Sequence, residues 1–143
     1  MSVDAYRLLR TLEDVSDRHA RTVRALDRML NRLRKDIENE ELQTAVKTYI
    51  RRLRVLRQRL ERALEGSIDF SEVDEVVREN VATLSEYMII VGFIYEEEVL
   101  RKARILAKRG ARILEEEYER INDDMEQLAR ISSRLQEIVD KYY

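Results

Sequence analysis

The sequence predicts an all-α protein, an antiparallel four-helix bundle whose long helices resemble coiled coils and run up-down-up-down. Apolar residues recur every three or four positions over most of the 143 residues, which is the spacing of one helix face. The chain has no proline and only three glycines, so it is poor in the residues that make turns. Its length suits a single helical domain over residues 1–143.

The first two helices are predicted at residues 3–37 and 40–65. In the first, a heptad pattern runs from Ala5 to Ile37, and Ser2 is placed to cap its start. Asn39 is expected to adopt the left-handed turn that follows a helix. Glu40 then supplies the negative charge that a helix N-terminus favours, and Gly66 is expected to end the second helix.

The last two helices are predicted at residues 71–109 and 111–142. The stretch that begins at Ser71 resembles a capping box, with Asp74 in the place of the usual glutamate. Residues 101–112 are basic and residues 115–126 are mainly acidic, which favours a helix end and a new helix start on either side of Gly110. The unchanged apolar phase favours the alternative, a single helix of about 70 residues whose overhang would need a second chain.

The stretch YMIIVGFIY, residues 87–95, is apolar around the whole circumference of a helix. Met88, Val91 and Tyr95 continue the inward seam, and the phase slips by two residues after Tyr95. One interpretation is core at a register shift, a second is a surface for self-association, and a third is a β-strand, which the helical spacing on both sides argues against. The candidate interface residues are Tyr87, Ile90, Val91, Gly92, Ile94 and Tyr95.

Two polar residues lie on the predicted apolar seam of the first helix, Ser16 and His19. We interpret them as buried polar groups that must find hydrogen bonds, with a ligand or acid–base role for His19 as the alternative. No nucleophile–base pair, phosphate-binding loop or di-iron motif is recognisable, so we expect no catalytic residues, no metal and no cofactor. The alternative is a Mg²⁺ or Mn²⁺ enzyme that uses some of the clustered carboxylates, namely Glu96, Glu97, Glu98, Glu115, Glu116, Glu117, Glu119, Asp123, Asp124 and Glu126.

The second helix carries the densest basic stretch, although the formal net charge of the chain is only −2. One hypothesis is that these side chains form ion pairs with the acidic block at residues 115–126. The other is that they contact nucleic acid through Lys47, Arg51, Arg54 and Arg62.

The function predicted from these patterns is non-enzymatic protein–protein association, as a homo-oligomer, scaffold or adaptor. The expected partner is a second copy of the chain or another helical protein, and nucleic-acid binding is the alternative. The longest apolar run has nine residues, and a membrane-spanning helix needs about 20, so we expect no membrane insertion. The start of the chain shows no signal-peptide pattern, and the chain has no cysteine, so we expect a cytoplasmic location. The excess of arginine over lysine suggests a heat-adapted source.

Overall fold

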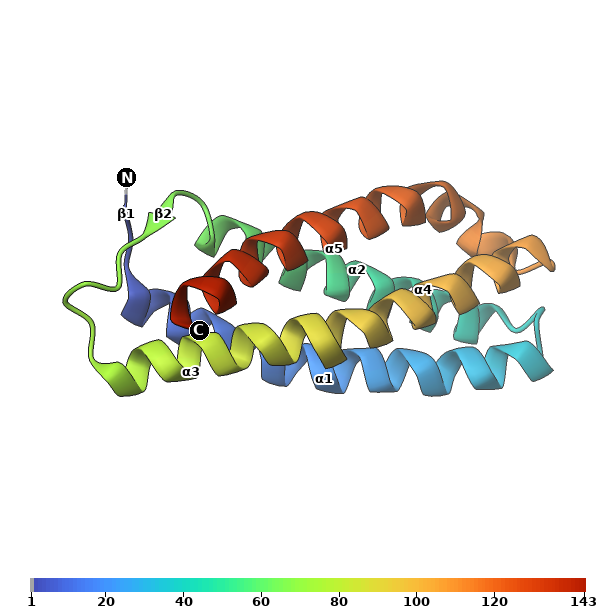
Figure 1. The fold of residues 1–143 in the computed structure, drawn as a ribbon. Helices are drawn as coiled ribbons and strands as arrows, with labels where there is room; N and C mark the ends of the chain where they lie inside the picture. The colour runs from blue at the N-terminus through green and yellow to red at the C-terminus, as the bar shows by residue number, and fades with distance from the viewer. Residues whose placement is uncertain (1) are drawn as a thin grey trace.

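The computed structural model describes residues 2–143 as an all-α protein of four long rods packed side by side (Figure 1). The first rod is α1, Ala5–Lys35, and the second is α2, Glu40–Ala63. The third is continuous through α3, Glu75–Tyr87, the π-helical turn η1, Met88–Gly92, and α4, Phe93–Lys108. The fourth is α5, Glu115–Tyr142, which follows the 3₁₀ turn η2, Arg112–Leu114.

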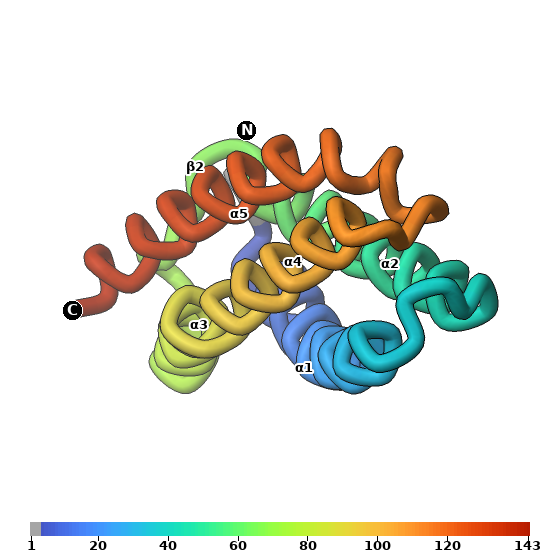
Figure 2. The backbone as a smooth tube through the Cα atoms, turned by 90° about the vertical axis from the view of Figure 1, so that its right-hand side faces the viewer, coloured from blue at the N-terminus to red at the C-terminus, as the bar shows by residue number. Residues whose placement is uncertain are grey.

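The chain reverses direction at each connection between rods, so the predicted up-down-up-down bundle is confirmed (Figure 1). Helix α1 packs against α2, α3 and α4, and α5 packs against the same three helices. The α1 rod therefore lies diagonally across from α5, and α2 lies diagonally across from α4, as the turned view shows (Figure 2). The core between the rods consists mainly of leucine, isoleucine, valine and alanine from all of them.

The helix starts differ from the predicted ones because aspartate and asparagine provide the N-caps. Asp4, not Ser2, caps α1 by accepting hydrogen bonds from the backbone N–H groups of Tyr6 and Arg7. The predicted capping box at Ser71 is wrong, because α3 is capped by Asp74 and begins four residues later. Asn39 does not take a left-handed turn, since its φ is −68° and its side chain caps α2 instead.

The two predicted glycine breaks are confirmed. Gly66 and Gly110 have φ values of 88° and 118°, a region that favours glycine. Gly110 follows the basic end of α4 and precedes the acidic first turn of α5, so the charges marked a real break. A single helix of about 70 residues is therefore excluded.

Side-chain hydrogen bonds close both ends of the bundle. At one end the buried Gln43 donates to the carbonyl of Ile37 and accepts from the N–H of Ile113, which ties two connections together. At the other end Arg134 donates to the carbonyls of Leu64 and Gly66, where α2 ends. There the backbone of Ser2–Val3, labelled β1, also pairs in parallel with β2, Ser67–Ile68. No strand was predicted from the sequence at Ser2–Val3 or at Ser67–Ile68.

Within residues 2–143, none of the helices combines the length and the apolarity that crossing a membrane requires.

Candidate functional site

The third rod changes its buried face at the π-turn. Val81 and Ser85 face the interior before the turn, Met88 and Gly92 face it at the first and last positions of the turn, and Glu96 faces it after the turn. A π-turn contains one residue more than an α-turn, so every residue after it is rotated by about 100° relative to an uninterrupted helix. The sequence predicted a phase slip after Tyr95, and the structure places it earlier, at Met88–Gly92.

The extra residue leaves apolar side chains on the solvent side of this rod. Tyr87, Ile90, Val91 and Ile94 are 36%, 60%, 47% and 52% exposed. Val91 was predicted to point inward, and that prediction is wrong because the π-turn rotates it outward. Val76 and Ile105 are also exposed, near the two ends of the same rod. We call this surface the outer apolar face, which consists of Val76, Tyr87, Ile90, Val91, Ile94 and Ile105.

Two of the six candidate interface residues lie elsewhere. Gly92 is buried, and a Cβ atom at this position would lie 3.3 Å from Met88 Sδ and 3.5 Å from His19 Cε1. A larger residue there would press on the interior of the monomer, so Gly92 is a core residue and not an interface residue. Tyr95 is half-buried, and its hydroxyl donates to Asp27 at 2.8 Å.

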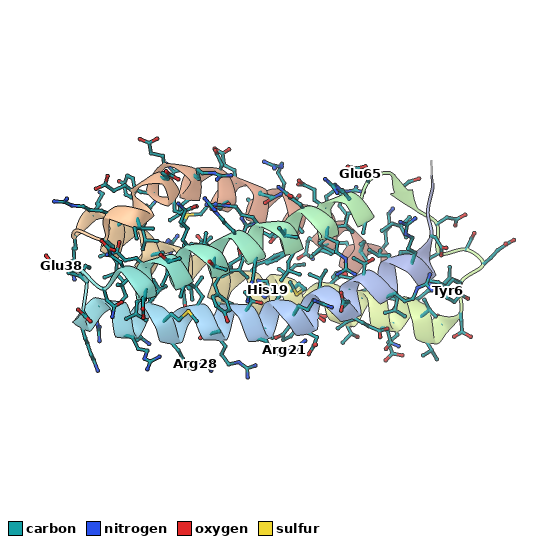
Figure 3. The ribbon with its side chains drawn as sticks, turned by 180° about the vertical axis from the view of Figure 1, so that it is seen from behind. Tyr6, His19, Arg21, Arg28, Glu38 and Glu65 are labelled. Carbon is teal, nitrogen blue, oxygen red and sulfur yellow. The ribbon has the colours of Figure 1, made fainter. Side chains whose placement is uncertain are left out.

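The rotation at the π-turn brings Glu96 into contact with His19 inside the bundle. His19 Nε2 lies 2.6 Å from Glu96 Oε1, and both side chains are buried. Because Glu96 also pairs with Arg57, its carboxylate serves as an acceptor, and the contact fits the tautomer in which Nε2 carries the hydrogen. The imidazole packs edge-on against Phe93 at 5.7 Å between ring centroids. His19 lies at mid-length of α1 on the side that faces the other helices, whereas Arg21 and Arg28 extend away from the bundle (Figure 3).

Ser16 is also buried, one turn before His19. Its hydroxyl donates to the carbonyl of Glu13 at 3.1 Å, which satisfies it within the helix.

Two buried arginines on α2 extend the contact between His19 and Glu96 across the bundle. The Arg57 guanidinium bonds to Glu96 on α4, to Asp124 on α5 at 2.5 Å and to Gln127 on α5 at 2.9 Å. Arg54 forms a bidentate pair with Asp124, at 2.8 Å for each bond, and a close ion pair with Glu117. We call this set the interior ion network, and it consists of His19, Arg54, Arg57, Glu96, Glu117 and Asp124.

The interior ion network joins all four rods, from His19 in the middle of α1 to Glu117 in the first turn of α5. The long Arg57 side chain bridges α2 and α4 across the diagonal of the bundle, where the helices themselves are not closely packed. Burial lowers the pKa of Arg54, but its hydrogen bonds to Asp124 and the charges of Asp124 and Glu117 outweigh burial, so the pKa is raised overall. The carboxylates thus hold the arginine in its charged form within the core.

The described residues include no group of three or more histidine, aspartate or glutamate side chains arranged to hold a metal ion. Of the carboxylates considered for a metal site, Glu96, Glu117 and Asp124 point inward, and arginines neutralise all three. The structure therefore places them in ion pairs that link helices.

The four basic residues predicted to contact nucleic acid do not form one free surface. Arg54 is buried in the interior ion network, so its assignment to that surface is wrong. Lys47 and Arg51 approach Glu116 and Glu117 at 3.3 Å and 3.5 Å, and Arg62 is exposed at the end of α2. The predicted pairing of the second helix with the acidic block is therefore confirmed for Lys47, Arg51, Arg54 and Arg57.

A groove of about 790 Å³ runs between α1 and α2 on the surface. Tyr49 and Leu56 line it together with four arginines, Arg18, Arg21, Arg51 and Arg52. The Arg52 guanidinium lies 4.7 Å above the Tyr49 ring. Asp14 and Asp17 bind Arg18 and Arg21 from the preceding turn of α1, at 2.9 Å and 2.6 Å.

Comparison of this chain with protein-family models, with curated proteins and with solved structures finds no match.

The interior ion network was not predicted as a unit, although some of its residues interrupt apolar patterns. On α2 the buried apolar positions Val46, Ile50, Leu53 and Leu60 follow steps of four, three and seven, and Arg57 is buried beside Leu56 inside the step of seven. On α5, Glu117 and Asp124 occupy slots in a series that otherwise contains buried leucine and isoleucine. A charged residue at an apolar slot on each of two helices, with opposite signs, would have indicated a buried ion pair.

Proposed function

We propose that this protein acts by non-enzymatic protein–protein association through the outer apolar face. The observation that carries the proposal is the exposure of Tyr87, Ile90, Val91 and Ile94 as a contiguous apolar surface on one rod. A helix of a self-sufficient bundle normally presents polar residues on its solvent side, because water contact with apolar side chains is unfavourable. A contiguous exposed apolar surface marks an interaction site in many proteins.

The proposal is supported by how residues divide between the two faces of this rod. Met88 and Phe93 fill the interior, whereas the exposed isoleucines leave half or more of their surface outside the monomer core. Six of the nine large apolar side chains that are exposed among the described residues lie along α3, η1 and α4. Full burial of a fully exposed side chain of this kind is worth about 1.5–3 kcal/mol, and a partner that covers the part still exposed gains a share of that free energy.

Photo-crosslinking in cells of the source organism tests this proposal. A photo-reactive phenylalanine analogue replaces Ile90 in one variant and Ile94 in another, which keeps the face apolar. We expect crosslinked species of higher mass from both variants. The matched control carries the same analogue at Tyr6, an exposed aromatic residue on α1 that lies outside the outer apolar face, and should give none. The proposal fails if positions 90 and 94 yield no more crosslinked product than position 6.

The groove between α1 and α2 supports a second candidate function, binding of nucleic acid. Arg52 lies over the Tyr49 ring, which offers a phosphate contact beside an aromatic surface for a base, and three further arginines that pair with carboxylates line the same groove. We expect fluorescence anisotropy to show binding to single-stranded RNA or DNA that weakens as salt rises. Arg21→Ala with Arg52→Ala should reduce the affinity about tenfold or more, whereas Arg28→Ala, on the outward side of α1, should not. An absence of binding at low salt would rule this function out.

A further inference from the structure

The outer apolar face has mirror symmetry along the chain about the midpoint between Ile90 and Val91. Tyr87 lies three residues before Ile90, and Ile94 lies three residues after Val91. Val76 and Ile105 lie fourteen residues outside the same central pair, on opposite sides. Every exposed large apolar residue of α3, η1 and α4 therefore has an apolar counterpart at its mirror position.

Mirror positions meet when two copies of one helix pack antiparallel about a two-fold axis. In such an isologous contact, a residue that precedes the axis faces the residue that follows it by the same number of positions. With the axis between Ile90 and Val91, these two residues face each other across the dimer. Tyr87 then faces Ile94, and Val76 faces Ile105.

Between Val76 and Ile105, the exposed charged and polar residues of this rod obey the same symmetry. Glu79 and Lys102 are mirror positions, so the arrangement places opposite charges together. Lys102 also binds Asp27 at 2.8 Å, but an ammonium group has three donors and can serve both carboxylates. The remaining mirror pairs are each neutral on one side, namely Thr83 with Glu98 and Asn80 with Arg101.

Other arrangements of the same two rods place unfavourable groups together. A parallel dimer puts each residue opposite itself, so Glu79, Glu98 and Arg101 would all face like charges. Sliding the antiparallel pair by three residues puts Ile105 opposite Glu79 and puts Glu86 opposite Glu98. Of these three arrangements, the antiparallel one centred between Ile90 and Val91 is the one that matches both apolarity and charge.

We propose that the partner of the outer apolar face is a second copy of this chain, packed antiparallel with the two-fold axis between Ile90 and Val91. This inference rests on the proposed function and specifies its partner. The π-turn makes the arrangement possible, because it turns Ile90 and Val91 outward together at the axis. The contact is one helix wide, which is small for a protein interface, so the dimer forms and dissociates with concentration.

Chemical crosslinking between engineered cysteines tests the register, because the natural chain has no cysteine. Thr83→Cys and Glu98→Cys are exposed and lie outside the outer apolar face. A short bismaleimide added to an equal mixture of the two variants is expected to give about ten times more crosslinked dimer than it gives with Ser133→Cys, an exposed control on α5. Each variant alone should give only the control level, because position 83 of one copy lies far from position 83 of the other.

The possible failures separate the register, the partner and the proposed function. Crosslinking of Thr83→Cys to itself would indicate a parallel dimer, and preferred crosslinking to Arg101→Cys would indicate the shifted register. Either result overturns the inference, although the outer apolar face would still be the interface. A monomeric mass by light scattering at the highest soluble concentration also overturns it. Photo-crosslinks from position 90 to a different protein would then leave the proposed function standing, and their absence would remove both.

Discussion

Arg57→Met is expected to lower the free energy of unfolding by about 3–5 kcal/mol, because it leaves buried carboxylates without their cationic partner. Arg57 is 1% exposed and bonds to Glu96, Asp124 and Gln127. Methionine retains most of the length and apolar volume of the side chain, so the loss reports on charge and hydrogen bonding. For a chain of this size the melting temperature should fall by roughly 6–20 °C.

Denaturant unfolding followed by circular dichroism measures this loss. The matched control is Arg62→Met, the same substitution on an exposed position of α2, which should change the free energy of unfolding by less than about 0.5 kcal/mol. Adding Glu96→Gln to Arg57→Met should restore part of the lost stability, since it removes the charge that had been left unpaired. Equal stabilities for Arg57→Met and Arg62→Met would contradict the stabilising role of Arg57 in the interior ion network.

Asp124→Asn is expected to cost about 3 kcal/mol, because Asp124 accepts hydrogen bonds from two buried arginines. Asparagine has nearly the same shape but offers one acceptor oxygen, and its amide N–H groups would face the guanidinium donors. Arg54 keeps Glu117 as an ion-pair partner, so the loss should be somewhat smaller than for Arg57→Met.

The neighbouring residue provides the control for this change. Asp123 is exposed on the same helix, so Asp123→Asn carries the same chemical change without burial. We expect it to leave the denaturation midpoint within the error of the measurement. If high salt abolished the difference between the two variants, the Asp124 contacts would have to be exposed to solvent, contrary to the structure.

The helices and their main break could be predicted from the sequence because local signals determine them. Heptad spacing marked all four rods, and the reversal of charge at Gly110 marked the turn before α5. The exact starts were less predictable, since Ser71, Asp74, Ser2 and Asp4 are all acceptable caps by residue type. Tertiary packing and the short pairing of β1 with β2 decide between them.

The π-turn explains why the sequence did not indicate which residues of the third rod are buried and which are exposed. A uniform helical period directs Val91 and Tyr95 into the core and leaves Glu96 outside. The structure inserts one residue at Met88–Gly92, so Glu96 reaches Arg57 and His19 while Val91 turns to the solvent. The π-turn thus brings Glu96 into the interior ion network and places Ile90 and Val91 on the outer apolar face. A π-turn inside a helix is commonly associated with function.

Gly92 illustrates why the two faces could not be separated from the sequence alone. It was predicted as an interface residue, and the structure shows instead that Met88 and His19 pack against it inside the bundle. An all-round apolar run identifies neither its inward nor its outward residues, because every rotation of the helix gives the same pattern. The buried carboxylate at Glu96 fixes that rotation, and its role is visible only with Arg57 in place.

Solvent accessibility of the isoleucine methyl groups, measured by NMR with a soluble paramagnetic agent across a dilution series, tests the central claim most directly. The outer apolar face is exposed in the single chain, and the proposed dimer would cover it, so the methyl groups of Ile90 and Ile94 should be strongly relaxed in dilute solution. They should become protected as the concentration rises, while Ile50 in the core stays protected throughout. Methyl groups of Ile90 and Ile94 that are protected even at the lowest concentration, or that stay accessible at the highest, would contradict the account.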